Sequence, residues 1–378
     1  MPSGSAASDG LPVTDRRAWG WVQHLRQGGT MPWADWDGHA EPGGRFIPGA
    51  QQLELLRRLN QVGKPSAQLR ERVLGASAPG RGQPDLELVG AAADSRFGPR
   101  PVDPATLPDV ELLRVAASIL AEDVVARGLP DPPTVGRPRP WRRHYRLHGD
   151  PELLGPVRAD LVARGRPPSG RAPVHVVLAT ELGGMLAHLW TDRALDSGVP
   201  GWRAWLRKLE RDGQLPQRID PLHLARHLRE RAGPDRIHVV LDPDAVGPLV
   251  GVRRPPAQPP ELAAESRELA RRIGGVVGLL VPDDQRKALM RETLRPWLVG
   301  QAGSRLIVPV EHQGWLSDHA ARIADGLSRA GYAVHGDPGR LAPVRGPGVE
   351  APAPHATLAL ALQMMLARAN EAEKEEAT

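Results

Sequence analysis

The 378-residue chain contains no cysteine and is poor in lysine and aromatic residues. Without cysteine it cannot form disulfides, use a thiolate nucleophile or bind zinc through thiolates. Only four of its 49 basic residues are lysine, and 4% of its residues are aromatic. Ten of the fourteen aromatic residues are tryptophan. The core must therefore consist mainly of leucine, valine and alanine, with a few large tryptophan anchors.

The sequence also lacks an apolar run of about 18 residues, which a membrane-spanning helix would require. Its first ten residues do not show the basic and then apolar order of a secretion signal. The formal net charge is +5, and acidic residues are interspersed along most of the chain. This modest charge disfavours nucleic acid as a partner. Together these features predict a soluble, cytoplasmic protein with no membrane partner.

Changes in composition divide the chain into five segments. A tryptophan-rich segment covers 1–50, and 51–128 shows the leucine spacing of a small helical domain. Five prolines in 129–141 predict a stiff linker. We expect an α/β domain at 142–346. The last segment, 347–378, should contain a helix at 357–369 and an acidic end at 371–378 that frays.

Four tryptophans of the first segment, Trp19, Trp21, Trp33 and Trp36, lie within eighteen residues. Exposed indoles in such a group could stack on nucleic-acid bases. The chain has few other large side chains to fill its core, so we predict that these indoles pack inside the protein. An Arg-rich nucleic-acid-binding protein, using these indoles and the basic cluster at 137–146, is kept as a second alternative function.

Short apolar runs alternate with helical patterns in the second half of the chain. The runs at 144–148, 174–179 and 236–242 are typical of strands, and each is followed by a segment with helical spacing. Strands that are apolar throughout and alternate with helices favour a parallel sheet covered on both faces. The sequence therefore predicts an α/β fold for this part of the chain.

The turn after the first of these strands is where a phosphate-binding loop would lie, since a helix N-terminus presents unpaired amides to an anion. It reads His148-Gly149-Asp150-Pro151-Glu152. A phosphate loop needs glycines and a cation, whereas Glu152 stands where the cation is needed. At about 4 Å and an effective dielectric constant of about 20, one misplaced unit charge shifts the interaction by around 4 kcal/mol. We therefore expect this turn to bind phosphate poorly.

Several motifs occur in a characteristic order between residues 142 and 344. They are Gly149-x-Pro151 at the start of a helix, Trp202-x-x-Trp205-Leu206, Pro309-x-x-His312-x-x-Trp315, and Ala330-Gly331-Tyr332-x-Val334-x-Gly336-Asp337. In this order they resemble the PAPS-dependent sulfotransferase-like proteins of actinobacteria. The resemblance implies a P-loop-like, three-layer sulfotransferase-type α/β domain, preceded here by a small α-helical domain.

The family's cofactor contacts can be carried over to this sequence position by position. In the family, the first loop holds the 5′-phosphosulfate of PAPS, and an arginine after the second strand holds its 3′-phosphate. Both contacts are replaced here. The resemblance thus implies a degenerate cofactor site at His148, Gly149, Asp150, Pro151, Glu152, Thr180 and Glu181.

These replacements predict a non-catalytic binding or accessory protein that uses no cofactor. Its expected partner is an active sulfotransferase relative or another protein. The alternative is an active sulfotransferase-type enzyme with a divergent donor site, in which Arg142, Arg143 and Arg146 hold PAPS. No residue is assigned a catalytic role.

The remaining histidine patterns predict no metal site. His223 and His227 have the i, i+4 spacing of two ligands on a helix, but the glutamate of a zinc-protease motif is missing. We expect both to be solvated. His312 and His319 lie seven residues apart, with acidic residues near by. A general base is conceivable there, but a capping or surface role is the prediction.

Overall fold

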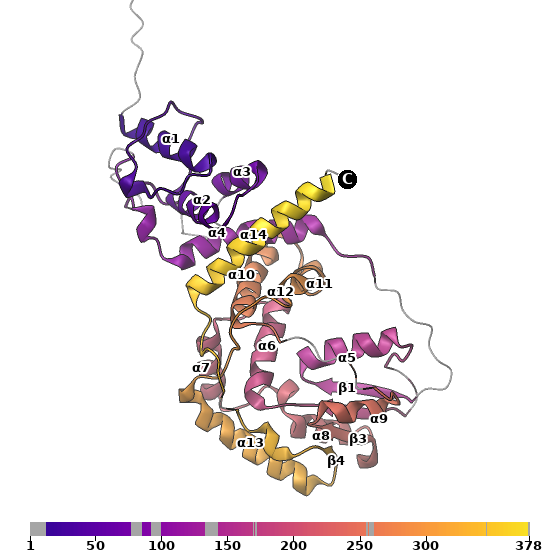
Figure 1. The fold of residues 1–378 in the computed structure, drawn as a ribbon. Coiled ribbons are helices and arrows are strands. Elements are labelled where there is room, and N and C mark those ends of the chain that lie inside the picture. Colours follow the sequence, from indigo (N-terminus) through magenta and orange to yellow (C-terminus); the bar gives the residue numbers. More distant parts are fainter. Residues whose placement is uncertain are drawn as a thin grey trace, which may run out of the picture. The chain divides into compact units, whose positions relative to one another are not determined.

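The computed structural model divides the chain into two compact units (Figure 1). The first contains Met1–Arg127 and Ala353–Thr378, and the second contains Gly128–Pro352. Of the linker predicted at 129–141, only 129–132 belong to the described part of the chain. The structure describes residues 13–76, 85–91, 100–132, 143–168, 170, 172–254, 256, 261–344 and 346–376.

The first unit is helical throughout its described residues, apart from short bridges and turns. Its longest helices, α4 and α14, pack along one another (Figure 1). Apolar residues of α2 and α4 interleave in the core of this unit because their leucines recur at helical spacing. The helices are α1 (Val13–Arg26), α2 (Ala50–Val62), α3 (Ala67–Gly75), α4 (Asp109–Arg127) and α14 (Pro354–Glu376).

The clustered tryptophans belong to the core of this unit. Trp19, Trp21 and Trp33 are buried, and the ring centroids of Trp21 and Trp33 lie 5.4 Å apart. The indole N–H groups of Trp21 and Trp33 each donate to a backbone carbonyl, which satisfies the polar end of each ring. Trp36 is half-buried. The packing prediction is therefore confirmed for the three buried indoles, which offer no free face for base stacking.

The last helix is longer than the sequence predicted. Helix α14 continues to Glu376 instead of ending near residue 369. Its apolar residues, including Leu362 and Met365, are buried, whereas its acidic end at 371–375 is exposed. The Arg127 guanidinium at the end of α4 lies 2.6 Å from the Glu375 carboxylate, an exposed ion pair that adds little energy. The fraying of this end stays a prediction.

The second unit is built on a four-stranded parallel sheet, so the predicted α/β class is confirmed. Its strands are adjacent in the order β1-β2-β3-β4, and every neighbouring pair is parallel. Leu147 is in register with Val176, and Val239 with Val334. The strands are β1 (Tyr145–Gly149), β2 (Val174–Leu178), β3 (Ile237–Val240) and β4 (Ala333–His335).

Helices cover both faces of this sheet. Leu147, Val176 and Val240 pack with α5 and α9 on one face, while Val177 and Val239 pack with α6, α7, α8 and α13 on the other. In the described part of the chain, every helix is too short or too polar to cross a membrane. The helices are α5 (Pro151–Ala163), α6 (Leu182–Asp196), α7 (Trp202–Asp212), α8 (Pro221–Arg229), α9 (Val246–Val250), α10 (Ala264–Leu280), α11 (Asp283–Ala288), the π-helical turn η6 (Leu289–Leu294), α12 (Arg295–Leu298) and α13 (Val310–Ala330).

The tryptophan anchors of the second unit allow a direct test of this core. Trp190 is fully buried, and its ring centroid lies 5.6 Å from that of Trp202. Trp190→Ala should lower the free energy of unfolding of this unit by roughly 3–5 kcal/mol, because it leaves a large cavity. Leu279→Ala, at an exposed position on α10, should change it by less than about 0.5 kcal/mol. Urea denaturation would measure both, and equal effects would contradict this description of the core.

Candidate functional site

The turn after β1 is where the predicted phosphate loop lies, and its backbone is shaped by Gly149. Gly149 has a φ of +116°, and a Cβ at this position would lie 2.0 Å from the Leu178 carbonyl oxygen. Only glycine fits such a close approach to the neighbouring strand. The chain then enters α5 through Asp150 and Pro151, a good N-cap followed by a residue suited to the first helical position.

A carboxylate of the protein itself occupies the N-terminus of α5. Asp150 is fully buried, and its Oδ1 accepts a hydrogen bond from the Glu152 backbone N–H at 3.0 Å. Its Oδ2 lies 2.6 Å from Nδ1 of His188 on α6. A bound phosphate would use the same amides and the same positive end of the helix dipole. Asp150 therefore takes the place that an anionic ligand would take.

Glu152 is tied into the same buried network and does not face solvent. Its side chain is 5% exposed and lies 3.5 Å from Nη2 of Arg267 and 3.9 Å from Nε2 of His188. Arg267, which is 1% exposed, also donates to the backbone carbonyls of Ala187 and Leu262. The misplaced anion predicted from the sequence is thus paired with a cation from α10.

The pKa of His188 reflects its place in this network. Burial by itself would lower this pKa, but the charge and hydrogen bond of Asp150, together with the charge of Glu152, raise it above its ordinary value. Two carboxylates, the His188 imidazole and the Arg267 guanidinium therefore lie together in this buried network.

The second predicted contact, at Thr180 and Glu181, follows β2. Glu181 is the N-cap of α6, and its carboxylate accepts hydrogen bonds from the N–H groups of Gly183 at 3.0 Å and Gly184 at 2.7 Å. Arg305 lies 3.3 Å from the same carboxylate. Thr180 is half-buried, and its side chain is uncharged. A second helix N-terminus is thus also capped by the protein's own carboxylate.

A cavity of about 360 Å³ opens beside the turn, with Gly149 and Pro151 on one wall. Arg158, Arg218 and Arg291 line it as well. Arg218 and Arg291 share the buried carboxylate of Asp192, whereas Arg158 forms no ion pair within the described residues. The cavity beside the turn therefore contains at least one arginine that no carboxylate of the described residues matches.

The arginines of the alternative donor site lie at the other end of β1. Arg143 precedes the strand and donates to the Pro248 carbonyl, and Arg146 is near its start, whereas Gly149 ends it. Six residues of strand span about 20 Å. Arg143 therefore cannot supply the missing cation at the turn, and Arg142 lies outside the described residues.

The sheet also carries two histidine pairs, one on each face. His148 Nε2 lies 3.1 Å from His175 Nδ1, and His238 Nδ1 lies 2.9 Å from His335 Nε2. The rings of each pair are stacked. A neutral pair needs one donor and one acceptor nitrogen, so adding protons to both rings would replace the hydrogen bond with repulsion.

The other histidines behave as structural or surface groups. His223 and His227 are exposed, as predicted. His312 is buried, and its Nδ1 lies 2.6 Å from a carboxylate oxygen of Glu210. His319 is buried beside Arg322. The surface role is therefore wrong for His312 and His319. No group of three or more potential metal ligands occurs among the described residues.

Two members of the buried network were not singled out from the sequence: His188 and Arg267. One weak indication of His188 is present in the sequence, where this histidine interrupts an apolar helix face at 182–190. Arg267 lies among Glu265, Ser266 and Glu268, a run that reads as a solvated surface. Only the packing of α10 against α6 shows that it is buried.

Comparisons with family models, with curated proteins and with solved structures found no match to this chain.

The pair of Glu152 and Arg267 can be tested by removing one partner. Arg267→Met leaves the Glu152 carboxylate buried without its cation, and should lower the free energy of unfolding of the second unit by about 3–5 kcal/mol. The double variant Glu152→Gln with Arg267→Met removes both charges and should recover part of this loss. Urea denaturation would measure the difference. Equal losses in the single and double variants would contradict the pairing.

The pair of His148 and His175 predicts a pH dependence of stability. Burial, then the charges of His175, Arg146 and Arg158, lower the pKa of His148 to about 4, from about 6.5 in the unfolded chain. Between these values the unfolded chain binds a proton that the folded chain does not. The free energy of unfolding should therefore fall as the pH falls from about 6.5 to about 4.

His148→Gln should make this decline shallower, since glutamine does not titrate. Urea midpoints measured across this pH range, for the natural protein and the variant, would check the expectation. Identical pH profiles would show that His148 does not contribute.

Proposed function

We propose that the second unit is a sulfotransferase-type α/β domain that has lost its sulfonyl donor, and that the protein is a non-catalytic binding or accessory protein. The observation that carries this proposal is the capping of two helix N-termini by the protein's own carboxylates. Asp150 caps α5 and Glu181 caps α6. These are the two positions that the resemblance assigns to the donor's phosphates.

The electrostatics of the turn support the same proposal. A donor phosphosulfate would add negative charge beside Asp150 and Glu152, two carboxylates that are already buried at this turn. One unbalanced charge at about 4 Å corresponds to about 4 kcal/mol at an effective dielectric constant of about 20. That is a loss of about a thousandfold in affinity. A weakly bound donor could not support efficient transfer.

The two alternative functions differ in the support that the geometry gives them. The divergent donor site needs arginines at the turn: Arg143 lies at the opposite end of β1, but Arg158, Arg218 and Arg291 line the cavity beside the turn. The nucleic-acid function needs accessible indoles, but Trp19, Trp21 and Trp33 are buried. A role in binding a protein partner requires neither feature.

Isothermal titration calorimetry with PAP, the donor without its sulfonyl group, tests this proposal. We expect no binding at micromolar concentrations and no shift in melting temperature on adding PAP. Micromolar binding would overturn the proposal. If the double variant Arg143→Ala with Arg146→Ala then abolished that binding, the enzyme with a divergent donor site would replace it.

A further inference from the structure

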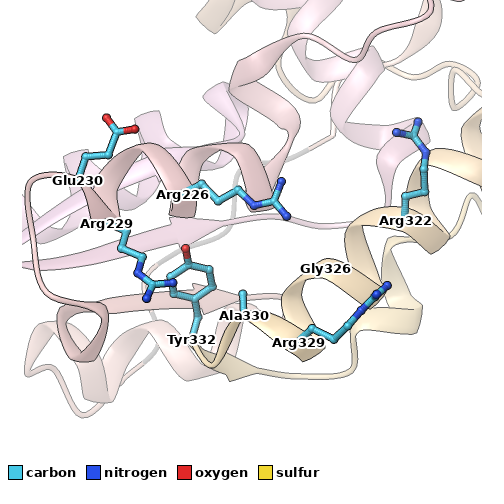
Figure 2. Close-up of a pocket in the computed structure, with 8 residues that line it drawn as sticks. All are labelled: Arg226, Arg229, Glu230, Arg322, Gly326, Arg329, Ala330 and Tyr332. Carbon is cyan, nitrogen blue, oxygen red and sulfur yellow. The ribbon is translucent and has the colours of Figure 1, made fainter.

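A groove lined by arginines lies between α8 and α13, away from the turn after β1. It encloses about 690 Å³. Arg226 and Arg229 come from α8, and Arg322 and Arg329 come from α13 (Figure 2). Figure 2 shows the Arg226 guanidinium reaching from α8 toward α13, and Arg229 beside the ring of Tyr332.

The walls of this groove are held close together by packing at its base. A Cβ on Gly326 would lie 2.2 Å from Cδ2 of Leu222, so this glycine lets α13 approach α8 closely. Tyr332, just before β4, is buried beneath the groove. The arginines therefore project from two packed helices, while their side chains are exposed to solvent.

The cations of the groove are poorly matched by anions. Arg226 and Arg229 form no ion pair within the described part of the chain. Arg329 lies 3.4 Å from Asp325, but both side chains are more than two-thirds exposed, and such pairs contribute little. Arg322 lies 2.6 Å from Nδ1 of His319. Burial lowers the pKa of His319, and the charge of Arg322 lowers it further. A histidine carries no negative charge, so His319 does not neutralise Arg322.

The backbone at the groove does not attract an anion, so the guanidiniums must hold the ligand. Helix α8 ends at Arg229 and α13 at Ala330, and both helices present their C-terminal carbonyls, which carry partial negative charge. Arg322 and Arg329 are two turns apart, roughly 10 Å along the axis. A chain with spaced negative groups fits this arrangement.

The surroundings distinguish an acidic peptide from a nucleic acid. A nucleic acid carries a charge on every phosphate and would place one beside Glu230, which also lines the groove, whereas a peptide can place a neutral residue there. The base is partly apolar, since Ala330 and Tyr332 contribute to it. An extended peptide can place carboxylates on the arginines and small apolar side chains on this base. Arginine also binds carboxylates through paired hydrogen bonds.

We propose that the groove between α8 and α13 binds an acidic peptide segment of a partner protein, through Arg226, Arg229, Arg322 and Arg329. This proposal names the kind of partner for the binding role proposed above, and it rests on that role. The residues of the groove are separate from those of the turn after β1. Binding of PAP would therefore overturn the earlier proposal without deciding this one.

Fluorescence anisotropy on the full chain tests the groove directly. The probe is a labelled dodecapeptide in which glutamate alternates with alanine and leucine. The double variant Arg226→Ala with Arg229→Ala should weaken binding by at least about tenfold, because it removes two charged donors. Arg329→Ala should weaken binding in the same direction. The matched control, Arg207→Ala with Arg211→Ala, removes the same charge from the exposed face of α7 and should retain the affinity.

Three results would overturn this proposal. The peptide could fail to bind the natural protein, or the groove and control variants could bind it equally. A single-stranded DNA of equal charge could bind more tightly and depend on Arg226 and Arg229, which would make nucleic acid the ligand. Circular dichroism melting curves ensure that the comparison uses folded variants, and Arg329→Ala provides a second reading if the double variant is unstable.

Discussion

The buried charges around the start of α5 constrain the arrangement of the second unit. Asp150 and Glu152 are carboxylates removed from water, and each such charge costs several kcal/mol unless a partner compensates it. His188 on α6 and Arg267 on α10 are these partners. Helices α5, α6 and α10 must therefore keep their relative positions, because moving one of them would leave a charge buried alone.

This constraint determines where the unit can bind a ligand. Open parallel sheets usually bind ligands beyond the carboxyl ends of their strands, where helix N-termini are gathered. In this protein Asp150 and Glu181 satisfy helix N-termini at that edge. Poorly matched cations are also found near the amino ends of β3 and β4, in the groove that contains Arg226 and Arg329.

Local patterns predicted much of the fold because their causes are local. The apolar runs correspond to β1, β2 and β3. The first turn requires a glycine because Gly149 lies very close to the backbone of Leu178. The buried tryptophans followed from the scarcity of other large side chains. The length of α14 was underestimated because a single sequence does not show that Glu375 lies beside Arg127.

The sequence by itself determined the class of fold, the position of the turn after β1 and the anion at Glu152, since these depend on hydrophobic periodicity and residue identity. Only the tertiary structure decided that Glu152 is compensated, because its partner Arg267 is more than a hundred residues away along the chain. The same holds for the groove, whose arginines come from two helices separated by some ninety residues. Charge interactions depend on distance in space, and a sequence records only distance along the chain.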